Sequence, residues 1–242
     1  GDRVAAYTPN TVEAVITMLA TASLGAVFSS CSPDFGLQGV CDRFGQIEPK
    51  ILVGCDGYHY AGKAIDRMDV LAALAQKLPT VNTVLVIGYL SAQPDCSRLP
   101  NAMLFDQAVA NATAITQFRR MPFNAPLYIL YSSGTTGAPK CIVHGIGGTL
   151  IQHIKEHRLH TNVKAGDRLF YFTTCGWMMW NWLVSGLASK AHILLYEGNP
   201  AYPGPDRLWQ LAEREKISIF GTSAKYIDSI KTSGFFPAAN VN

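Results

Sequence analysis

Short apolar runs alternate with helical patterns along most of this chain, and this alternation constrains the fold more than any other feature. Strands that follow one another through an intervening helix usually pair in parallel, because the helix carries the chain back to the same edge of the sheet. The sequence therefore predicts an α/β fold, with mostly parallel sheets flanked by helices. The predicted strands are residues 4–7, 27–28, 51–53, 84–87, 127–131 and 141–144.

Three helices are predicted between the first four strands. The first begins at a capping box, in which the side chains of Asn10 and Glu13 satisfy free backbone N–H groups, and it ends at Gly25. Spacings of three and four residues place apolar side chains on one face of each helix. These faces are Val12, Val15, Ile16 and Leu19 in the first helix, Val40, Phe44 and Ile47 in the second, and Leu71, Leu74, Ala75 and Leu78 in the third.

A proline-rich stretch over residues 88–125 interrupts this rhythm and predicts a connection between two lobes. Three segments recur in order after it: residues 1–3 as 166–168, residues 26–28 as 191–193, and residues 50–53 as 216–219. Two interpretations stay open, an internal repeat or two generic units that share Gly-Asp turns. Both predict two similar lobes in a layered αβαβα arrangement, over residues 1–120 and 121–242.

Composition narrows the class of protein. Hydrophobic residues make up 48% of the 242 residues and charged residues 15%, which permits a large core and argues against disorder. The net charge of +3 comes from scattered basic residues, which argues against nucleic-acid binding. Six cysteines without a Cys-x-x-Cys pair argue against a zinc site and favour a reducing compartment, the cytoplasm. The sequence shows no signal peptide and no apolar run long enough to cross a membrane.

A segment rich in hydroxyl groups and glycine lies between the strands at residues 127–131 and 141–144. It contains Ser132, Ser133, Gly134, Thr135, Thr136, Gly137 and Lys140. Glycine lets a backbone fold closely around a ligand, and free N–H groups and hydroxyls donate hydrogen bonds to phosphate oxygens. The segment therefore predicts a phosphate-binding loop, and the alternative is an exposed polar hairpin turn.

This predicted phosphate loop differs from a Walker loop. A Walker loop has adjacent Gly and Lys, followed by Ser or Thr at the start of a helix. Here Ala138 and Pro139 separate Gly137 from Lys140, and a strand follows.

The sequence Tyr-Ser-Ser-Gly-Thr-Thr-Gly-x-Pro-Lys at residues 131–140 resembles the phosphate-loop signature of the superfamily of acyl- and aryl-CoA synthetases, adenylation domains and luciferases. Residues 1–29 and 42–50 resemble the first lobe of that superfamily. Its members join a carboxylate to ATP, releasing pyrophosphate and forming an acyl-adenylate, and many then transfer the acyl group to CoA.

Within the superfamily, residues 31–36, 140–145 and 171–182 resemble the ligases of acetoacetate. The resemblance extends over residues 1–236. It implies an AMP-forming acid–thiol ligase whose small-molecule substrates are ATP, acetoacetate and CoA, with Mg²⁺ as a cofactor and with no nucleic acid or membrane as a partner. The alternative is a related ligase for another short acid, such as acetate.

By resemblance, the hydroxyl and glycine residues of the phosphate loop bind the β- and γ-phosphates, and Lys140 balances their charge. Trp177, Met178 and Met179 fall where the ligases of acetate form the wall of the acyl pocket. Those ligases have Val-Thr in place of the two methionines, and flexible Met side chains suit a pocket of altered shape. Core packing stays open for the Met pair, and it is the favoured interpretation for Trp180 and Trp182.

Lys63 lies near the position where the ligases of acetate hold the 3′-phosphate of CoA with two arginines. Tyr60 stands in place of the first of these arginines, and Ala201 stands in place of an Asn that contacts CoA. Two interpretations of Lys63 therefore stay open, a CoA contact or a solvated surface lysine.

His153, Glu156 and His157 fit the His-x-x-Glu-His pattern of inverted zinc metalloproteases. Such a short pattern arises often by chance, and the phosphate loop just upstream indicates a different fold. We therefore interpret these residues, together with Lys155, as the polar face of a helix.

Several parts that the superfamily uses are not found in these 242 residues. They are the Glu that binds Mg²⁺, the Asp that holds the ribose, and a C-terminal domain with the catalytic Lys. The chain also begins inside a predicted strand. We therefore expect a fragment of the large N-terminal domain of an adenylate-forming enzyme, inactive alone and without catalytic or metal-binding residues of its own. The alternative is a stand-alone nucleotide- or CoA-binding module.

Overall fold

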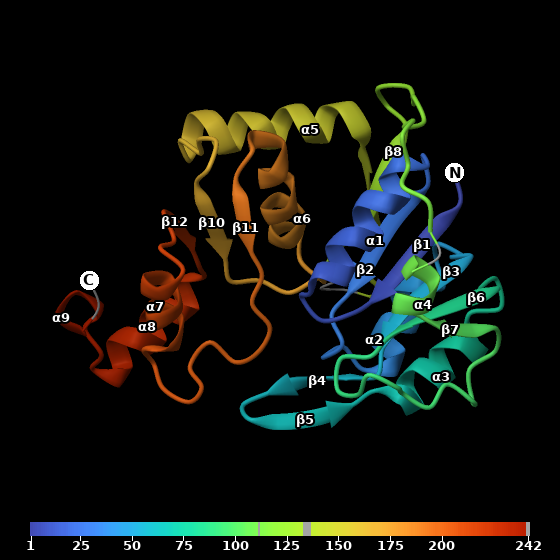
Figure 1. The fold of residues 1–242 in the computed structure, drawn as a ribbon, viewed down its shortest axis with the longest axis horizontal. Helices are drawn as coiled ribbons and strands as arrows, with labels where there is room; N and C mark the ends of the chain where they lie inside the picture. Colours follow the sequence, from blue (N-terminus) through green and yellow to red (C-terminus); the bar gives the residue numbers. More distant parts are fainter. Residues whose placement is uncertain (111, 133–136, 241–242) are drawn as a thin grey trace. The chain divides into compact units, whose positions relative to one another are not determined.

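The computed structural model describes residues 1–110, 112–132 and 137–240 (Figure 1). The chain forms two compact units. Unit 1 comprises Gly1–Tyr58 and Ala64–Thr149, and unit 2 comprises His59–Lys63 and Leu150–Asn242.

Unit 1 contains a sheet of seven strands in the order β7-β6-β3-β1-β2-β8-β9. Neighbouring strands are parallel, except that β8 and β9 pair antiparallel. The mostly parallel sheet predicted from the alternation of strands and helices is confirmed. The strands are β1 (Arg3–Tyr7), β2 (Val27–Cys31), β3 (Ile51–Cys55), β6 (Thr83–Ile87), β7 (Ala102–Leu104), β8 (Pro126–Tyr131) and β9 (Cys141–Gly145).

Helices cover both faces of this sheet (Figure 1). Side chains alternate between the faces along a strand, so Ala5 and Tyr7 of β1 share a core with α2 (Leu37–Phe44) and α3 (Met68–Lys77). Val4 of β1 lies on the other face, where it lines an apolar hollow with residues of α1 (Val12–Ser23) and α4 (Phe105–Ala110). Every side chain of the apolar faces predicted for the second and third helices is buried, which confirms both faces.

Two predictions for α1 are wrong. Its N-cap residue is Thr11, one residue after the predicted Asn10, and Thr11 makes no side-chain capping bond. The predicted apolar face is also rotated, because Val12, Ile16 and Leu19 are 61%, 42% and 47% exposed. The buried residues are Ala14, Val15, Thr17, Met18 and Thr21. Threonine fits this buried face because the hydroxyls of Thr17 and Thr21 each donate to the carbonyl one turn back, so they need no partner outside the helix.

Two further features are missing from the sequence-based prediction. The strands β4 (Gly57–Tyr60) and β5 (Lys63–Asp66) form a two-stranded ribbon. The residues that join them, Ala61 and Gly62, have φ values of 48° and 76°, as a type I′ turn requires, and Ala-Gly is a weaker signal for that turn than Asn-Gly. The stretch predicted as a connection, residues 88–125, contains β7 and α4, which extend unit 1.

Unit 2 contains a parallel sheet of three strands in the order β11-β10-β12. Phe170 of β10 packs in one core with residues of α7 and α8, and Leu169 packs in another core with Leu183 of α6. The elements are α5 (Ile146–Lys155), the π-helical turn η1 (Glu156–His160), β10 (Arg168–Tyr171), α6 (Met178–Ser185), the 3₁₀-helix η2 (Gly186–Ser189), β11 (His192–Leu194), α7 (Arg207–Arg214), β12 (Ile219–Gly221), α8 (Ala224–Ser233) and α9 (Pro237–Asn240). Helix α5 begins in unit 1 and ends in unit 2.

The sheet of unit 2 repeats the central topology of unit 1. Strand β10 lies between β11 and β12, as β1 lies between β2 and β3. The pairing register is equivalent in the two sheets: Arg3 with Val27 and Arg168 with His192, and Val4 with Ile51 and Leu169 with Ile219. Equivalent registers favour the internal repeat over two generic units. They also correct the predicted alignment of the third segment, since Ile51 corresponds to Ile219 and not to Ile217.

The domain ranges predicted from the sequence, 1–120 and 121–242, stay a prediction. None of the helices in the described ranges has the length and the apolar character needed to cross a membrane.

Candidate functional site

The predicted phosphate loop connects β8 to β9 at one edge of the large sheet of unit 1. Ser133, Gly134, Thr135 and Thr136 lie outside the described residues. The described members of the loop are Ser132, Gly137 and Lys140.

The two ends of the loop are joined by reciprocal hydrogen bonds. The N–H of Ser132 donates to the carbonyl of Lys140 at 3.0 Å, and the N–H of Lys140 donates to Oγ of Ser132 at 3.1 Å. The side-chain amide of Gln46, which follows α2, donates to the carbonyl of Pro139 at 2.8 Å. The base of the loop is thereby fixed, and the hydroxyl proton of Ser132, which neither of its bonds uses, can still be donated to a ligand.

Two of the predicted site residues in the loop, Gly137 and Lys140, face solvent. The side chain of Lys140 is exposed, and none of the described carboxylates forms an ion pair with it. Gly137 is also exposed, and a Cβ atom placed on it would meet no described atom within 4 Å. The described protein atoms would therefore leave room for a larger side chain here, so they do not explain why this residue is glycine.

The end of β8 that leads into the loop is held from the side by Arg43. The guanidinium carbon of Arg43 lies 4.6 Å from the ring centroid of Phe35 and 5.8 Å from that of Tyr131. The hydroxyls of Ser29 and Tyr131 lie 2.9 Å apart, and burial raises the pKa of Tyr131 far above its ordinary value. Tyr131 therefore stays neutral, and the loop starts from a rigid strand end.

The residues predicted for the acyl pocket lie at the start of α6, which follows the carboxyl end of β10. Trp177 occupies the N-cap position and is 61% exposed, and Met178 is 46% exposed. Met179 is half-buried, and Trp180 is fully buried, as predicted. The exposure of Trp177 and Met178 argues that neither side chain packs in the core. Their position also suits a ligand site, because ligands bind preferentially beyond the carboxyl ends of parallel strands.

One residue of α6 that the sequence did not single out is Asn181. Its side chain is fully buried, and neither its amide nitrogen nor its amide oxygen has a partner among the described residues. A buried amide normally finds hydrogen-bond partners, so Asn181 is a polar group that packing alone does not explain. The one sign of it in the sequence is its position as a polar residue between two tryptophans, Trp180 and Trp182.

Tyr60, Lys63 and Ala201, which stand at or near the positions predicted from the CoA contacts of the ligases of acetate, all lie in unit 2. Tyr60 and Lys63 flank the turn of the β4–β5 ribbon, and both are exposed. A Cβ atom on Gly62 in that turn would lie 2.2 Å from the hydroxyl oxygen of Tyr202, the residue after Ala201. The structure therefore brings Lys63 and Ala201 into one neighbourhood, although 137 residues separate them in the chain.

The prediction that His153 and His157 belong to a polar helix face is wrong. They are 7% and 0% exposed, because α5 and η1 turn this face toward α6, where both imidazoles make hydrogen bonds. Glu156 pairs with Lys155 at 3.0 Å instead. Within the described ranges no three His, Cys, Asp or Glu side chains are grouped as a metal site requires.

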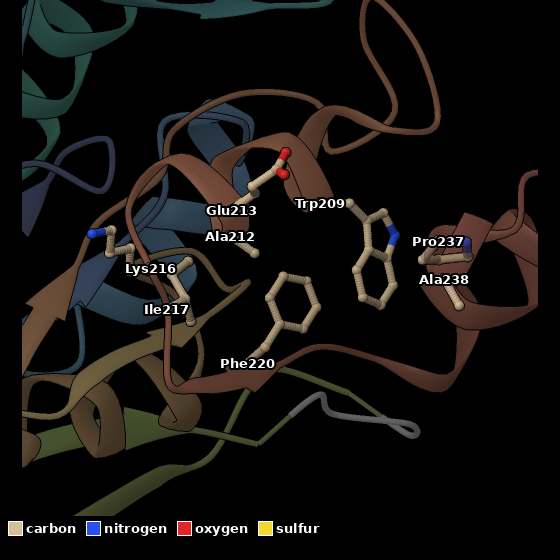
Figure 2. Close-up of a pocket in the computed structure, with 8 residues that line it drawn as sticks. All are labelled: Trp209, Ala212, Glu213, Lys216, Ile217, Phe220, Pro237 and Ala238. Carbon is tan, nitrogen blue, oxygen red and sulfur yellow. The ribbon is translucent and has the colours of Figure 1, made fainter. Parts of the chain in front are cut away.

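A separate hollow in unit 2 contains none of the predicted site residues (Figure 2). Figure 2 shows the indole of Trp209 between Phe220 and α9, and the rings of Trp209 and Phe220 stack at 5.0 Å with an angle of 16°. The lining residues are Trp209, Ala212, Glu213, Lys216, Ile217, Phe220, Pro237 and Ala238. We do not include this hollow in the candidate site.

Comparison with known proteins agrees with the resemblance over the whole chain. Acetoacetyl-coenzyme A synthetase of Rhizobium meliloti (strain 1021) is 53% identical over 238 residues, which are 98% of this chain and 37% of that protein. Acetoacetyl-CoA synthetase of Gallus gallus is 46% identical over 248 residues, covering 100% of this chain and 37% of that protein. The solved structure of acetoacetyl-CoA synthetase from Streptomyces lividans matches with a TM-score of 0.94 and 44% identity, covering 100% of this chain and 36% of that one.

The chain spans little more than a third of the length of these relatives. The resemblance to the ligases of acetoacetate and the predicted fold class are confirmed by these matches. The sequence model of a family described as AMP-binding enzyme matches residues 1–240. The chain therefore belongs to the family of AMP-binding enzymes.

Proposed function

We propose that this chain is part of an AMP-forming acid–CoA ligase that activates acetoacetate. The observation that carries the proposal is the similarity of the whole chain, in sequence and in fold, to acetoacetyl-CoA synthetases. In the proposed reaction, a carboxylate oxygen of acetoacetate attacks the α-phosphorus of ATP, and the bond from that phosphorus to pyrophosphate breaks. The sulfur of CoA then attacks the carbonyl carbon of the acyl-adenylate, and AMP leaves.

We assign the binding of the β- and γ-phosphates to the phosphate loop. Negative charge grows on pyrophosphate as it leaves, and donors that are already oriented toward that charge stabilise the transition state. The role is supported by the fixed base of the loop, by the hydroxyl proton of Ser132, which neither of its hydrogen bonds to Lys140 uses, and by the charge of Lys140, which no described carboxylate neutralises. Gly137 fits it as well, since close approach of a phosphate gives a reason for glycine that the described protein atoms do not. The same role is proposed for Ser133, Gly134, Thr135 and Thr136.

We assign the wall of the acyl pocket to Trp177, Met178 and Met179. The exposure of Trp177 and Met178 at the start of α6 leaves surface for a ligand. Acetoacetate is two carbons longer than acetate and carries a second carbonyl, so its pocket must be longer without placing a charge beside the acid. Unbranched thioether side chains meet both conditions.

We assign a contact with CoA to Lys63. Its exposed ammonium group lies on the ribbon that contacts the segment after Ala201, which supports a shared surface for the nucleotide end of CoA. The free thiols of all six cysteines support a reducing compartment, the cytoplasm, as the location.

The proposed reaction uses Mg²⁺, and the described residues do not fit a site for it, because they form no group of three acidic, His or Cys side chains. We therefore assign no step to Mg²⁺ through these residues. Its ligand is proposed to lie in the part of the ligase that this chain does not include, together with the catalytic Lys.

The test is exchange of labelled pyrophosphate into ATP by the ligase at the full length of its relatives, with acetoacetate or acetate as the acid. We expect exchange that depends on acetoacetate, a loss of about tenfold or more in Lys140→Ala, and little loss in Lys77→Ala, which removes an exposed lysine of the same unit. The 242-residue chain alone should show no exchange. An intact enzyme that shows no acetoacetate-dependent exchange, or equal rates for the two lysine variants, would contradict the assignment.

A further inference from the structure

Two buried histidines bind the last residue of α6. Nδ1 of His153 and Nε2 of His157 each lie 2.9 Å from Oγ of Ser185. Nε2 of His157 also lies 3.0 Å from the carbonyl oxygen of Trp182, to which the Ser185 hydroxyl donates at 2.6 Å. The imidazole of His157 packs against the indole of Trp182, with ring centroids 4.2 Å apart. We call His153, His157, Ser185 and Trp182 the Ser185 cluster, and all four belong to unit 2.

The positions of the protons in the Ser185 cluster follow from its acceptors. The carbonyl of Trp182 can only accept, and the Ser185 hydroxyl has one proton, which goes to that carbonyl. Oγ of Ser185 must then accept from both histidines, which assigns a proton to Nδ1 of His153 and to Nε2 of His157. Nδ1 of His157 is left without a proton, and it has no hydrogen-bond partner among the described residues. The cluster therefore has one self-consistent arrangement, with a neutral His157.

The Ser185 cluster and the first turn of α6 lie on one stripe of the helix. At 3.6 residues per turn, positions separated by four and by seven residues return to nearly the same face. Met178 is the first residue of α6, Trp182 follows it by four positions, and Ser185 follows it by seven. A rotation of α6 about its axis would therefore move Met178 together with the two anchored residues.

The anchoring helix has an unusual geometry at this point. Helix α5 changes into the π-helical turn η1 between His153 and His157. Single π-helical turns are rare and often lie at functional sites, because they redirect the side chains that follow. Here both imidazoles point to one hydroxyl oxygen.

We propose that Ser185, with His153 and His157, is a positioning residue for acid selectivity, because it fixes the rotation of α6 and thereby the place of Met178. This inference rests on the proposed function, in which Met178 forms the wall of the acyl pocket. Without the hydroxyl, both imidazoles lose their shared acceptor, and of the hydrogen bonds in the Ser185 cluster only the one from His157 to the Trp182 carbonyl still holds α6, beside its apolar packing. A displacement of about 1 Å, caused by a substitution away from the reacting atoms, can cost about 100-fold in rate.

The test uses the intact ligase and compares kcat/KM for acetoacetate and for acetate in pyrophosphate exchange. In Ser185→Ala the ratio of the two values should fall about tenfold, while KM for ATP stays within about twofold of wild type. Ser185→Thr keeps the hydroxyl and should keep the ratio. Ser189→Ala is the matched control, since Ser189 lies four residues further on, at the end of η2, and is buried, but its hydroxyl has no partner among the described residues.

Combination with the pocket variant separates this inference from the proposed function. Met178→Val with Met179→Thr should also lower the ratio, and Ser185→Ala should lower it little further in that background, because both changes act through the same wall. A ratio that is unchanged in Ser185→Ala, or a full additional loss in the combined variant, overturns the positioning role. Wild-type enzyme without acetoacetate-dependent exchange would instead refute the proposed function.

A second substitution keeps the test informative if Ser185→Ala fails to fold. The amide of Gln can place an N–H where His157 has Nε2, whereas Leu cannot. His157→Gln should therefore keep the acetoacetate-to-acetate ratio, and His157→Leu should lower it about tenfold. Equal ratios in these two variants would refute the role of the hydrogen bonds in the Ser185 cluster.

Discussion

The carboxylate of Asp56 offers the sharpest test of how unit 1 is held together. Asp56 follows β3, is 3% exposed, and accepts hydrogen bonds from three consecutive backbone N–H groups after β6. Oδ1 accepts from Tyr89 at 2.8 Å and from Leu90 at 2.9 Å, and Oδ2 accepts from Leu90 at 3.1 Å and from Ser91 at 2.8 Å. Its own carbonyl accepts from the N–H of Arg67 at 2.7 Å, next to the end of β5. Asp56 therefore joins the loop after β6 to the base of the ribbon that carries Lys63.

The substitution Asp56→Asn keeps the shape of the side chain and replaces one acceptor oxygen with an NH₂ group. An amide has one acceptor oxygen for the three N–H groups, so at least one of these part-buried donors loses its partner, which costs about 1–3 kcal/mol. The bonds that remain lose the help of a full negative charge, which weakens them by about 1 kcal/mol in total. We therefore expect the free energy of unfolding to fall by about 2–4 kcal/mol, a large part of the stability of a typical domain.

The measurement is urea unfolding of the 242-residue chain, followed by circular dichroism, with amide hydrogen exchange at residues 89–91. Asp95→Asn is the matched control, because the Asp95 carboxylate accepts one backbone N–H, from Ser97 at 3.0 Å, but is exposed to water. Asp56→Asn should shift the urea midpoint much further than Asp95→Asn and should speed exchange of the three amides. Equal midpoints for the two variants, with unchanged exchange, would refute this account of the loop.

Two other predictions concern stability. Gly54→Ala should destabilise the chain by about 1–3 kcal/mol, because a Cβ atom there would lie 2.3 Å from Cδ1 of the buried Leu71, whereas Gly148→Ala, in an open position on α5, should raise the melting temperature. Burial lowers the pKa of His157 and of His144 below 6.5, so the unfolded chain binds protons more readily than the folded one in this range. Stability should then be complete above about pH 6.5 and fall as the pH drops through the folded pKa values, and urea unfolding of His157→Gln should show a weaker fall.

The sequence predicted the type and order of most strands and helices of unit 1 because these depend on periodicity. An alternating spacing indicates a strand and a spacing of three to four residues indicates a helix, whichever way the element later packs. The helices α2 and α3 bury the side chains that this spacing indicated. The phase of α1 could not be predicted in this way. Thr17 and Thr21 count as polar in a sequence pattern, yet their hydroxyls bond within the helix and their methyl groups fit a buried face.

The candidate site was predictable where its chemistry is local and was missed where it depends on packing. The hydroxyls, glycines and lysine of the predicted phosphate loop lie within residues 132–140, so the sequence could locate the strands on either side of it, β8 and β9, while the role of the loop stays a prediction. The Ser185 cluster joins residues 32 and 28 positions apart, and burial of His153 and His157 depends on the π-helical turn that precedes the approach of α6. Nothing in the local pattern distinguishes these histidines from solvated ones.

The recurring Gly-Asp-Arg segment shows which part of the repeat serves the fold. In each copy the Asp carbonyl accepts from the N–H at the start of the second strand, at 2.8 Å. In each copy the Arg side chain donates to a carbonyl of the turn before the third strand, Ile47 for Arg3 and Glu215 for Arg168. The next residue in each turn, Glu48 or Lys216, has a left-handed backbone, with φ values of 48° and 49°.

A single tripeptide therefore fixes three parallel strands in each unit from their amino ends. These shared hydrogen bonds do not involve the carboxyl ends of the strands, and the two copies differ at those ends. Strand β1 continues into Thr8 and the entry of α1, whereas β10 continues through residues 173–176 to Trp177 and Met178. Ligand sites of parallel sheets lie beyond the carboxyl ends, so a shared frame at the amino ends leaves the carboxyl end of β10 available for the proposed acyl pocket without disturbing the pairing of the strands.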